Sequence, residues 1–467
     1  MQLGAEIKLT TFPGLRGWAG LAILSLALAG VFALLLALSR TPGVENILLW
    51  PLDFFNKGLV IHVVFSFIVW FLSVFGAILS IATVRLGGVS GLLEKILLII
   101  AYASTVMLFA PSFMNRGEAT LNNYIPAITD PLYYSGLVAL GGSLGIMALR
   151  LLVAFSTSAG RWRQPFCFGA LVAAFLYLLA LAVFTVTGVR LAGEDFSYEF
   201  NEAMFWGGGH TLLYVNLSLL FIALGTLLSL WTGKSCSGYG KSTTIAYILL
   251  AATATLGLYV TLSYAPDHDL YWSLFTKLQF GMAIPSLLFG FPLLMSIISV
   301  YKTDGYLPWH QPVFLCLALS PIVFAAGGLL GLFVDGADTR TPAHYHGVIA
   351  GINLSFMGLF YGLFLPLMGR DLKPSRLVNA QIWMYGGGQL LASLGLFMAG
   401  GYGTPRKIAG EAQNLSDFGA VVGMYLNGIG ALIAISGGVT FIWMIARALL
   451  RSPQQSVETY VDNKKIL

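Results

Sequence analysis

Charged residues are scarce in this sequence, and their scarcity decides its class. Only 10% of the 467 residues are Asp, Glu, Lys or Arg, whereas 57% are hydrophobic. The mean hydropathy of +0.81 lies far above that of soluble globular proteins. The composition excludes a soluble globular protein and favours a polytopic membrane protein, for which no nucleic-acid partner is expected.

Cysteine is also rare. The three cysteines, Cys167, Cys236 and Cys316, are scattered and form no CxxC or CxH spacing. This excludes a disulfide framework, a zinc site of the usual spacing and the covalent attachment of a c-type haem. We interpret the three side chains as small apolar or loop residues.

Long apolar runs, by contrast, are abundant. Twelve runs have about the 20 residues that a bilayer crossing needs. They cover residues 17–39, 58–84, 92–114, 132–155, 165–189, 205–231, 244–264, 272–300, 312–334, 345–368, 380–402 and 418–447. We predict an all-α membrane protein of about 12 transmembrane helices, one domain over residues 1–467 with tails at 1–16 and 448–467. No small-residue cleavage site follows the first run, so we expect a retained helix rather than a signal peptide.

The charges that are present predict the orientation in the membrane. Seventeen Lys and Arg residues fall in the two tails and in the connections after even-numbered runs, and only seven fall in the connections on the opposite side. Fourteen of the twenty carboxylates lie on that opposite side. Because cytoplasmic loops carry the excess of Lys and Arg, we expect both termini in the cytoplasm.

Histidine is the third scarce residue, but four of the six histidines share one depth. His62 begins the second run, His210 the sixth, and His344 and His346 the tenth. With this topology, all three runs enter the bilayer from the outer side. A histidine in a membrane is costly unless it is bound or hydrogen-bonded, and neutral imidazole is the commonest metal ligand. We interpret the four as one cofactor layer; the alternative is a set of interfacial histidines.

His344 and His346 indicate two different neighbours rather than one shared metal. At about 100° per residue, their positions point about 200° apart on a helix. A helix that carries one axial ligand on each side is able to hold two haems.

Histidines on helices 2, 6 and 10 of a twelve-helix protein resemble the catalytic subunit I of the haem-copper oxidase superfamily over essentially the whole chain. That superfamily includes oxygen-reducing terminal oxidases and nitric oxide reductases. The resemblance implies that His344 ligates a high-spin haem and that His62 and His346 together ligate a low-spin haem. It also implies a bacterial or archaeal cytoplasmic membrane and a place in a respiratory chain.

Two further segments carry the resemblance. GHTLLY is similar to the family's G-H-P-x-V-Y, whose histidine ligates the copper-B ion and whose tyrosine is linked to it in many oxidases; this implies those roles for His210 and Tyr214. GTPRKIAG is similar to the family's G-x-P-R-R loop, whose cations hold haem propionates, which implies that role for Arg406 and Lys407. The alternatives are a packing tyrosine and a solvated basic loop.

The sequence departs from the family at the copper-B site. The two adjacent histidines that end helix 7 in the family align with Val260 and Thr261. Neither side chain replaces an imidazole, so copper or non-haem iron is doubtful. His268 and His310 are interpreted as surface and interfacial residues.

Lys277, about five residues into the eighth run, is a further candidate. A buried ammonium in a membrane span is by default a functional hypothesis. It would supply either the positive charge that copper gives or a proton-relay step, as a catalytic residue beside Tyr214. The alternative is a lysine that reaches the outer interface.

Two functions remain open. In the first, electrons pass from the low-spin haem to the high-spin haem, where oxygen or nitric oxide is reduced. In the second, the chain is a non-catalytic di-haem electron-transfer subunit of a larger membrane complex, and His210 caps the second haem. Both need other membrane subunits and a cytochrome c, cupredoxin-like or quinol electron donor, because no copper-A or cytochrome c domain is present. A transporter that shares only the helix count would leave the two neighbouring histidines unexplained.

Overall fold

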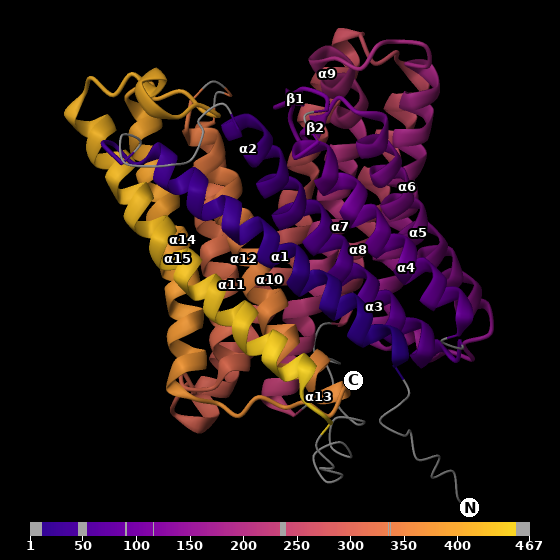
Figure 1. Cartoon of the computed structure of the whole chain (residues 1–467). Coiled ribbons are helices and arrows are strands. Elements are labelled where there is room, and N and C mark those ends of the chain that lie inside the picture. Colours follow the sequence, from indigo (N-terminus) through magenta and orange to yellow (C-terminus); the bar gives the residue numbers. More distant parts are fainter. Residues whose placement is uncertain are drawn as a thin grey trace, which may run out of the picture.

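A computed structural model gives the fold for residues 12–44, 54–88, 91–114, 116–233, 240–334, 336 and 338–453. These residues form a bundle of long helices with short connections (Figure 1). Twelve helices among them are long and apolar enough to cross a membrane, which confirms the prediction of an all-α bundle of 12 spans.

The first six crossings are α1 (Pro13–Arg40), α2 with α3 (Phe55–Val63 and Trp70–Leu86), α4 (Leu92–Phe109), α5 (Pro131–Ser156), α6 (Pro165–Arg190) and α7 (Tyr198–Thr232). The others are α8 (Gly240–Ser263), α9 with α10 (Asp269–Leu278 and Ala283–Asp304), α11 (Pro312–Leu330), α12 with α13 (Arg340–Leu359 and Leu365–Leu367), α14 (Arg376–Gly401) and α15 (Phe418–Leu450). Two short strands, β1 (Ala119–Thr120) and β2 (Ala127–Ile128), pair antiparallel in the loop between α4 and α5.

Local signals set the helix ends. Proline stands at the first helical position of α1, α5, α6 and α11, where its missing N–H has no intrahelical acceptor to lose. Gly87, Gly233 and Gly305 follow α3, α7 and α10 in the left-handed conformation that ends many helices. The Ser197 side chain accepts from the Phe200 N–H and starts α7 two turns before the predicted run at 205–231, so Glu199 and Glu202 are part of the helix.

The spans that carry the predicted ligands lie at the centre of the bundle. Within the most apolar window of each span, 89% of residues are buried in Phe55–Leu86, 89% in Tyr198–Thr232 and 83% in Arg340–Leu367. The same share lies between 17% and 61% in the other nine candidate spans of the described residues. Two of the three central spans contain a π-helical turn, Val64–Val69 after α2 and Phe360–Phe364 after α12. Such turns are frequent at functional sites.

Glycines let α14 and α15 approach each other closely. A Cβ added to Gly388 or Gly395 would lie 2.5 or 2.4 Å from a backbone nitrogen of α15, at Ala434 and Asn427 respectively. On the other helix, a Cβ at Gly423, Gly430 or Gly437 would lie 2.4–2.7 Å from backbone nitrogens of α14. The seven-residue spacing on both helices therefore forms one glycine seam, in which backbone packs directly on backbone.

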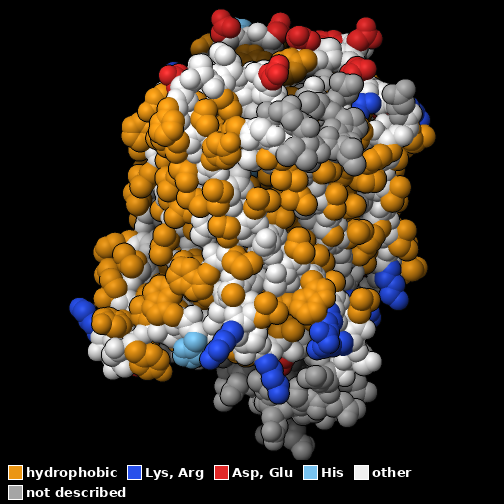
Figure 2. All heavy atoms as spheres, turned by 60° about the vertical axis from the view of Figure 1, so that its left-hand side comes forward, with side chains coloured by type: hydrophobic (Ala, Val, Ile, Leu, Met, Phe, Trp, Pro, Cys, Tyr) orange, Lys and Arg blue, Asp and Glu red, His pale blue; other side chains and the backbone are white. Residues whose placement is uncertain are grey.

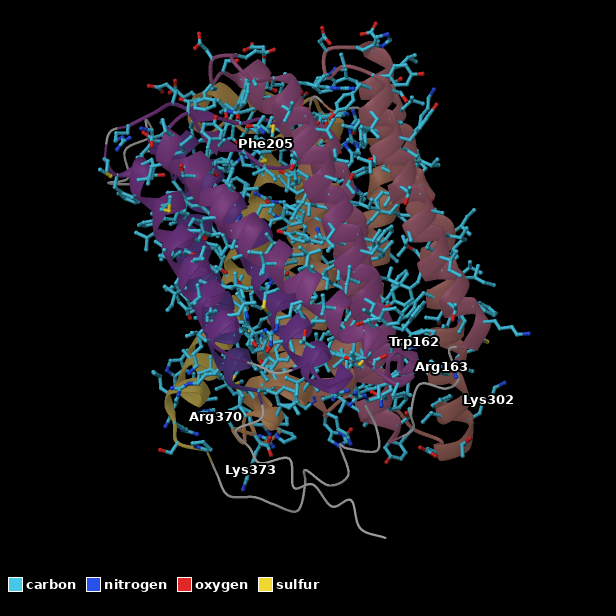
Figure 3. The ribbon with its side chains drawn as sticks, turned by 90° about the vertical axis from the view of Figure 1, so that its right-hand side faces the viewer. Trp162, Arg163, Phe205, Lys302, Arg370 and Lys373 are labelled. Carbon is cyan, nitrogen blue, oxygen red and sulfur yellow. The ribbon has the colours of Figure 1, made fainter. Side chains whose placement is uncertain are left out.

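Charge is segregated between the two ends of the bundle. Figure 2 shows acidic side chains at one end, Lys and Arg mostly at the other, and a hydrophobic belt between them. Arg163, Lys302, Arg370 and Lys373 lie at the same end, opposite to Phe205 (Figure 3). This is the pattern of a protein whose middle is surrounded by lipid.

Candidate functional site

His62 is oriented by a carbonyl of the neighbouring helix. Its Nδ1 lies 3.1 Å from the Ala29 carbonyl oxygen of α1. A carbonyl only accepts, so Nδ1 carries the proton and donates it. The lone pair then belongs to Nε2, and a carbonyl at the other ring nitrogen is the usual support of a metal-ligating histidine.

His344 is held in the same way on the other side of the site. Its Nδ1 lies 2.8 Å from the Gly327 carbonyl oxygen of α11. This contact is possible because α11 and α12 touch through glycines: a Cβ on Gly347 would lie 2.6 Å from the Gly327 Cα. His344 thus also presents Nε2 as its free ligand atom.

His346 faces a different neighbour from His344. It lies near the side chains of His62 and Arg40 and near the Gln389 side chain of α14. The structure therefore brings His62 and His346 together from α2 and α12, whereas His344 faces α11.

Arg40 supplies a physical test of whether this region fits a haem. It ends α1, and its Nε and Nη2 atoms are buried with no hydrogen-bond partner among the described residues. A buried, unpaired guanidinium is unfavourable unless an anionic or polar group meets it. The His62 imidazole with its fixed tautomer and the neighbouring His346 imidazole, close to such a cation, suit a haem, whose axial positions take histidine and whose propionates are anions.

His210 is different, because both of its ring nitrogens are already used. Nδ1 lies 2.8 Å from the Trp206 carbonyl oxygen, and Nε2 lies 2.7 Å from the Tyr124 hydroxyl. The imidazole is buried among the rings of Tyr124, Trp206 and Phe275, whose centroids lie 4.5, 4.8 and 5.6 Å away. His210 does not present a free lone pair in this arrangement.

Hydrophobic packing surrounds the end of α8, where the family's histidine pair would stand. Val260, Tyr271 and Phe275 form one buried cluster with Val183, and Thr261 is fully buried. The Thr261 hydroxyl donates to the Gly257 carbonyl of its own helix. The described residues contain no group of three or more His, Cys, Asp or Glu side chains suited to a metal ion. A copper-B type metal therefore does not fit the residues present.

Tyr214 and Lys277 are not brought together with His210 as one polar group. The Tyr214 hydroxyl donates to the Leu278 carbonyl oxygen at 2.6 Å, at the break between α9 and α10. Lys277 is exposed on the outside of the bundle. Its exposure favours the alternative in which this lysine reaches the interface, because only an inward-facing ammonium could act beside His210.

Arg406 and Lys407 lie over the loop between α4 and α5. Arg406 donates to the Asn123 side chain at 3.2 Å, and the Lys407 ammonium donates to the Leu121 carbonyl oxygen. Burial, with the nearby Arg406 charge, lowers the pKa of Lys407 to about 8, although Glu202 acts in the opposite direction. This basic pair is thus partly buried rather than fully solvated.

The remaining two histidines are peripheral. The His268 Nδ1 accepts from the Leu270 N–H and caps α9, and the side chain is exposed, as the sequence predicted. His310 is exposed at the basic end of the bundle.

Sequence reasoning missed two residues of this site. Arg40 is one of the seven cations in the outer connections and was not predicted as a site residue, although a cation at the end of an apolar run is a recognisable signal. Tyr124 carried no signal at all, because its contact with His210 depends on how a loop folds over α7.

Comparisons with known proteins identify the family of the chain. A family model described as cytochrome C and quinol oxidase polypeptide I matches residues 16–433. The chain is 24% identical over 271 residues to cytochrome c oxidase subunit 1 of Thermus thermophilus, which covers 53% of this chain and 48% of that protein. It is 25% identical over 503 residues to a protein of Rickettsia prowazekii described as uncharacterized, covering 93% and 95% of the two chains.

Solved structures show the same fold. A haem-copper terminal oxidase dimer determined by cryo-EM superposes with a TM-score of 0.79, covering 96% of this chain and 85% of that chain at 18% identity.

A further sequence relative is an uncharacterized protein of Aquifex aeolicus, which is 28% identical over 361 residues, or 75% of this chain and 84% of that protein. Because the family model spans most of its length, this chain belongs to the haem-copper oxidase subunit I family, cytochrome c and quinol oxidase polypeptide I.

Proposed function

We propose that the chain passes electrons from a low-spin haem, held by His62 and His346, to a second haem held by His344, at which oxygen or nitric oxide is reduced. Membership of the family implies haem binding and a redox role in respiration. When bound, haems supply one-electron transfer and, where the iron keeps an open position, a coordination site for a diatomic molecule.

Each of the described site residues has a proposed role in holding the haems. The carbonyls of Ala29 and Gly327 fix the tautomers of His62 and His344, so that each offers Nε2. Arg40, with its unpaired buried nitrogens, meets an anionic or polar edge of the low-spin haem. Arg406 and Lys407, as the basic pair of the outer loop, are proposed to hold propionates.

The observation that carries the proposal is the contrast between His344 and His210. His344 has one ring nitrogen on a carbonyl and the other free, whereas both ring nitrogens of His210 are hydrogen-bonded. If a second haem is bound, the His344 imidazole would hold it, and the described residues would leave a coordination position for a small molecule. Tyr214 is kept as the proposed proton-delivering residue, whereas Lys277, exposed on the outside of the bundle, is given no such role.

The test is an optical and EPR spectrum of the reduced protein with and without carbon monoxide, together with analysis for copper and non-haem iron. We expect one low-spin haem and one haem whose spectrum shifts with carbon monoxide. His344→Ala should abolish the shifted component and His62→Ala the low-spin one, whereas His310→Ala, at the exposed basic end, should change neither. Two low-spin haems whose spectra do not change when carbon monoxide is added would contradict the reduction of a diatomic molecule.

A second function, a non-catalytic di-haem electron-transfer subunit, is favoured by the packing at the end of α8. Val260, Tyr271 and Phe275 fill the region in which the family places ligands of a second metal. In this case both haems would be six-coordinate, and His210 would have to leave Tyr124 to act as the sixth ligand. The same spectra distinguish the two functions.

The electron donor and the membrane orientation are proposals as well. We propose that the basic end faces the cytoplasm, by the excess of Lys and Arg there. Other membrane subunits, with a cytochrome c, a cupredoxin-like protein or a quinol, would deliver the electrons to a bacterial or archaeal cytoplasmic membrane protein.

A further inference from the structure

Tyr124 adopts a backbone conformation that is unusual for its residue type. Its φ is +64°, in the left-handed region that bulky side chains rarely occupy. Such strain persists only where the surroundings enforce it, typically at functional positions. The strained residue is the one that reaches His210.

The surroundings of Tyr124 enforce this position from three sides. The carboxylate of Glu202 on α7 accepts from the N–H and from the side-chain amide of Asn123, at 2.7 and 2.5 Å. Arg406 donates to the same Asn123, and Lys407 donates to the Leu121 carbonyl. The loop residues 121–124 are thus fastened to α7 and to the loop before α15.

A missing side chain on α7 makes room for the tyrosine. A Cβ on Gly209 would lie 2.4 Å from the Tyr124 Cβ, so only glycine lets the Tyr124 ring lie beside His210. The two rings are 4.5 Å apart between centroids. The contact between Tyr124 and His210 therefore depends both on the conformation of the loop and on the glycine in α7.

The proton positions of the pair follow from its chemistry. Burial and the nearby Glu202 charge raise the pKa of Tyr124, so its hydroxyl keeps its proton. The Trp206 carbonyl only accepts, so the His210 Nδ1 carries a proton and its Nε2 accepts from Tyr124. Both ring nitrogens of the imidazole are then satisfied.

We propose that the Tyr124 hydroxyl occupies, at the Nε2 of His210, the position that a metal ion takes in a copper-B site, so that the chain carries a metal-free tyrosine–histidine pair there. Tyr124 is the positioning residue of this pair. The same hydrogen bond keeps His210 from becoming the sixth ligand of a haem. This pair rests on the proposed function, because it is assumed to lie beside the proposed second haem. Its test measures the metal content of the protein and does not depend on haem chemistry.

The experiment measures copper in the purified full-length protein after incubation with Cu⁺ and removal of the excess. The unsubstituted protein should hold no more copper than His210→Gln. Tyr124→His, which places a second imidazole against Nε2, should gain about one copper ion per chain, because two imidazoles suffice for Cu⁺. This gain should disappear when His210→Gln is added. Tyr134→Phe, which loses a hydroxyl bonded to Asn201 at the same end of the bundle, should gain none.

Two results would overturn the proposal. One is copper in the unsubstituted protein that His210→Gln removes; the other is a folded Tyr124→His protein that gains none. If Tyr124→His does not fold, infrared spectroscopy tests the hydrogen bond between Tyr124 and His210 instead. The tyrosine C–O band that Tyr124→Phe removes should shift in His210→Gln, and an unshifted band would contradict the pair. Loss of the haem spectrum with these copper results unchanged would count against the proposed function and not against the pair.

Discussion

Three histidines of this chain share one hydrogen bond at Nδ1 but differ in what contacts Nε2. His62, His210 and His344 each place Nδ1 against a backbone carbonyl, which fixes the proton on that nitrogen. What differs is the group at Nε2, which Tyr124 occupies at His210 only. We therefore expect such a histidine to be available as a ligand, or to act as a hydrogen-bond acceptor, according to one neighbouring side chain.

Lys407 makes stability depend on pH. Its pKa is about 8 in the folded protein, whereas an unhindered lysine has a pKa of 10.5. Between these values the unfolded chain binds more protons than the folded one, so stability should rise as pH increases from about 8 towards 10.5. Below pH 8 both states carry the charge and the burial cost is fully present.

The measurement is the midpoint of thermal unfolding in detergent between pH 7 and pH 10. Relative to Lys407→Gln, the unsubstituted protein should gain stability across this range. Lys302→Gln, an exposed lysine at the other end of the bundle, serves as the matched control. Identical pH profiles for the protein and for Lys407→Gln would contradict the prediction.

At this scale the sequence singled out the candidate ligands but not the residues that contact them. His62, His344 and His346 stood out because imidazole is rare and costly in a membrane span. Tyr124 and Ala29 did not, because their contacts depend on a positive φ angle and on a backbone carbonyl, neither of which has a residue signature.

At the scale of the helix, glycine spacing places His344. A Cβ at Gly327 would lie 2.3 Å from the Val348 nitrogen, so Gly327→Ala must push α11 and α12 apart. The carbonyl that orients His344 would move with α11. We expect a loss of about 1–3 kcal/mol in stability and a loss of the second haem from the spectrum.

Gly328→Ala provides the control in the next residue, since no described atom lies within 4 Å of a Cβ there. This variant should keep both the stability and the spectrum. Thermal unfolding and haem content decide the comparison, and equal effects of the two substitutions would disprove a role for helix contact.

Helix positions were predicted more accurately than helix ends. All twelve runs correspond to spans, because a run of apolar residues of bilayer length has few other solutions. The extension of α7 through Glu199 and Glu202 was missed, since its polar first turns lie beyond the apolar run. The two π-helical turns were also not predictable, because they change hydrogen-bond register without a change in hydropathy.

For the whole molecule, the segregation of charge predicts how the protein lies in the membrane. Arg163 is exposed at the basic end of the bundle (Figure 3), and Asp267 is exposed in the loop that leads into α9, which lies at the other end (Figure 1). In a background with the three cysteines changed to alanine, Arg163→Cys should react with an impermeant maleimide only when the cytoplasmic face is accessible. Asp267→Cys should react in intact cells, and the opposite result would reverse the proposed orientation.

The fold class followed from composition, but the site did not. Hydropathy and the three histidine-bearing spans were enough to predict the bundle and the family that the comparisons confirm. The packing of Phe275 and Val260 at the end of α8 came only from the structure, because sequence shows that two ligands are missing but not what fills their place.

The glycine seam between α14 and α15 limits how this part of the chain is able to evolve. At Gly388, Gly395, Gly423, Gly430 and Gly437, any side chain meets backbone that has no room to yield. Gly387, which precedes Gly388, and Gly438, which follows Gly437, have no described atom within 4 Å of an added Cβ. Tolerance to substitution should therefore recur with the same seven-residue period, and sequence drift in the last quarter of the protein is confined to the faces turned away from the seam.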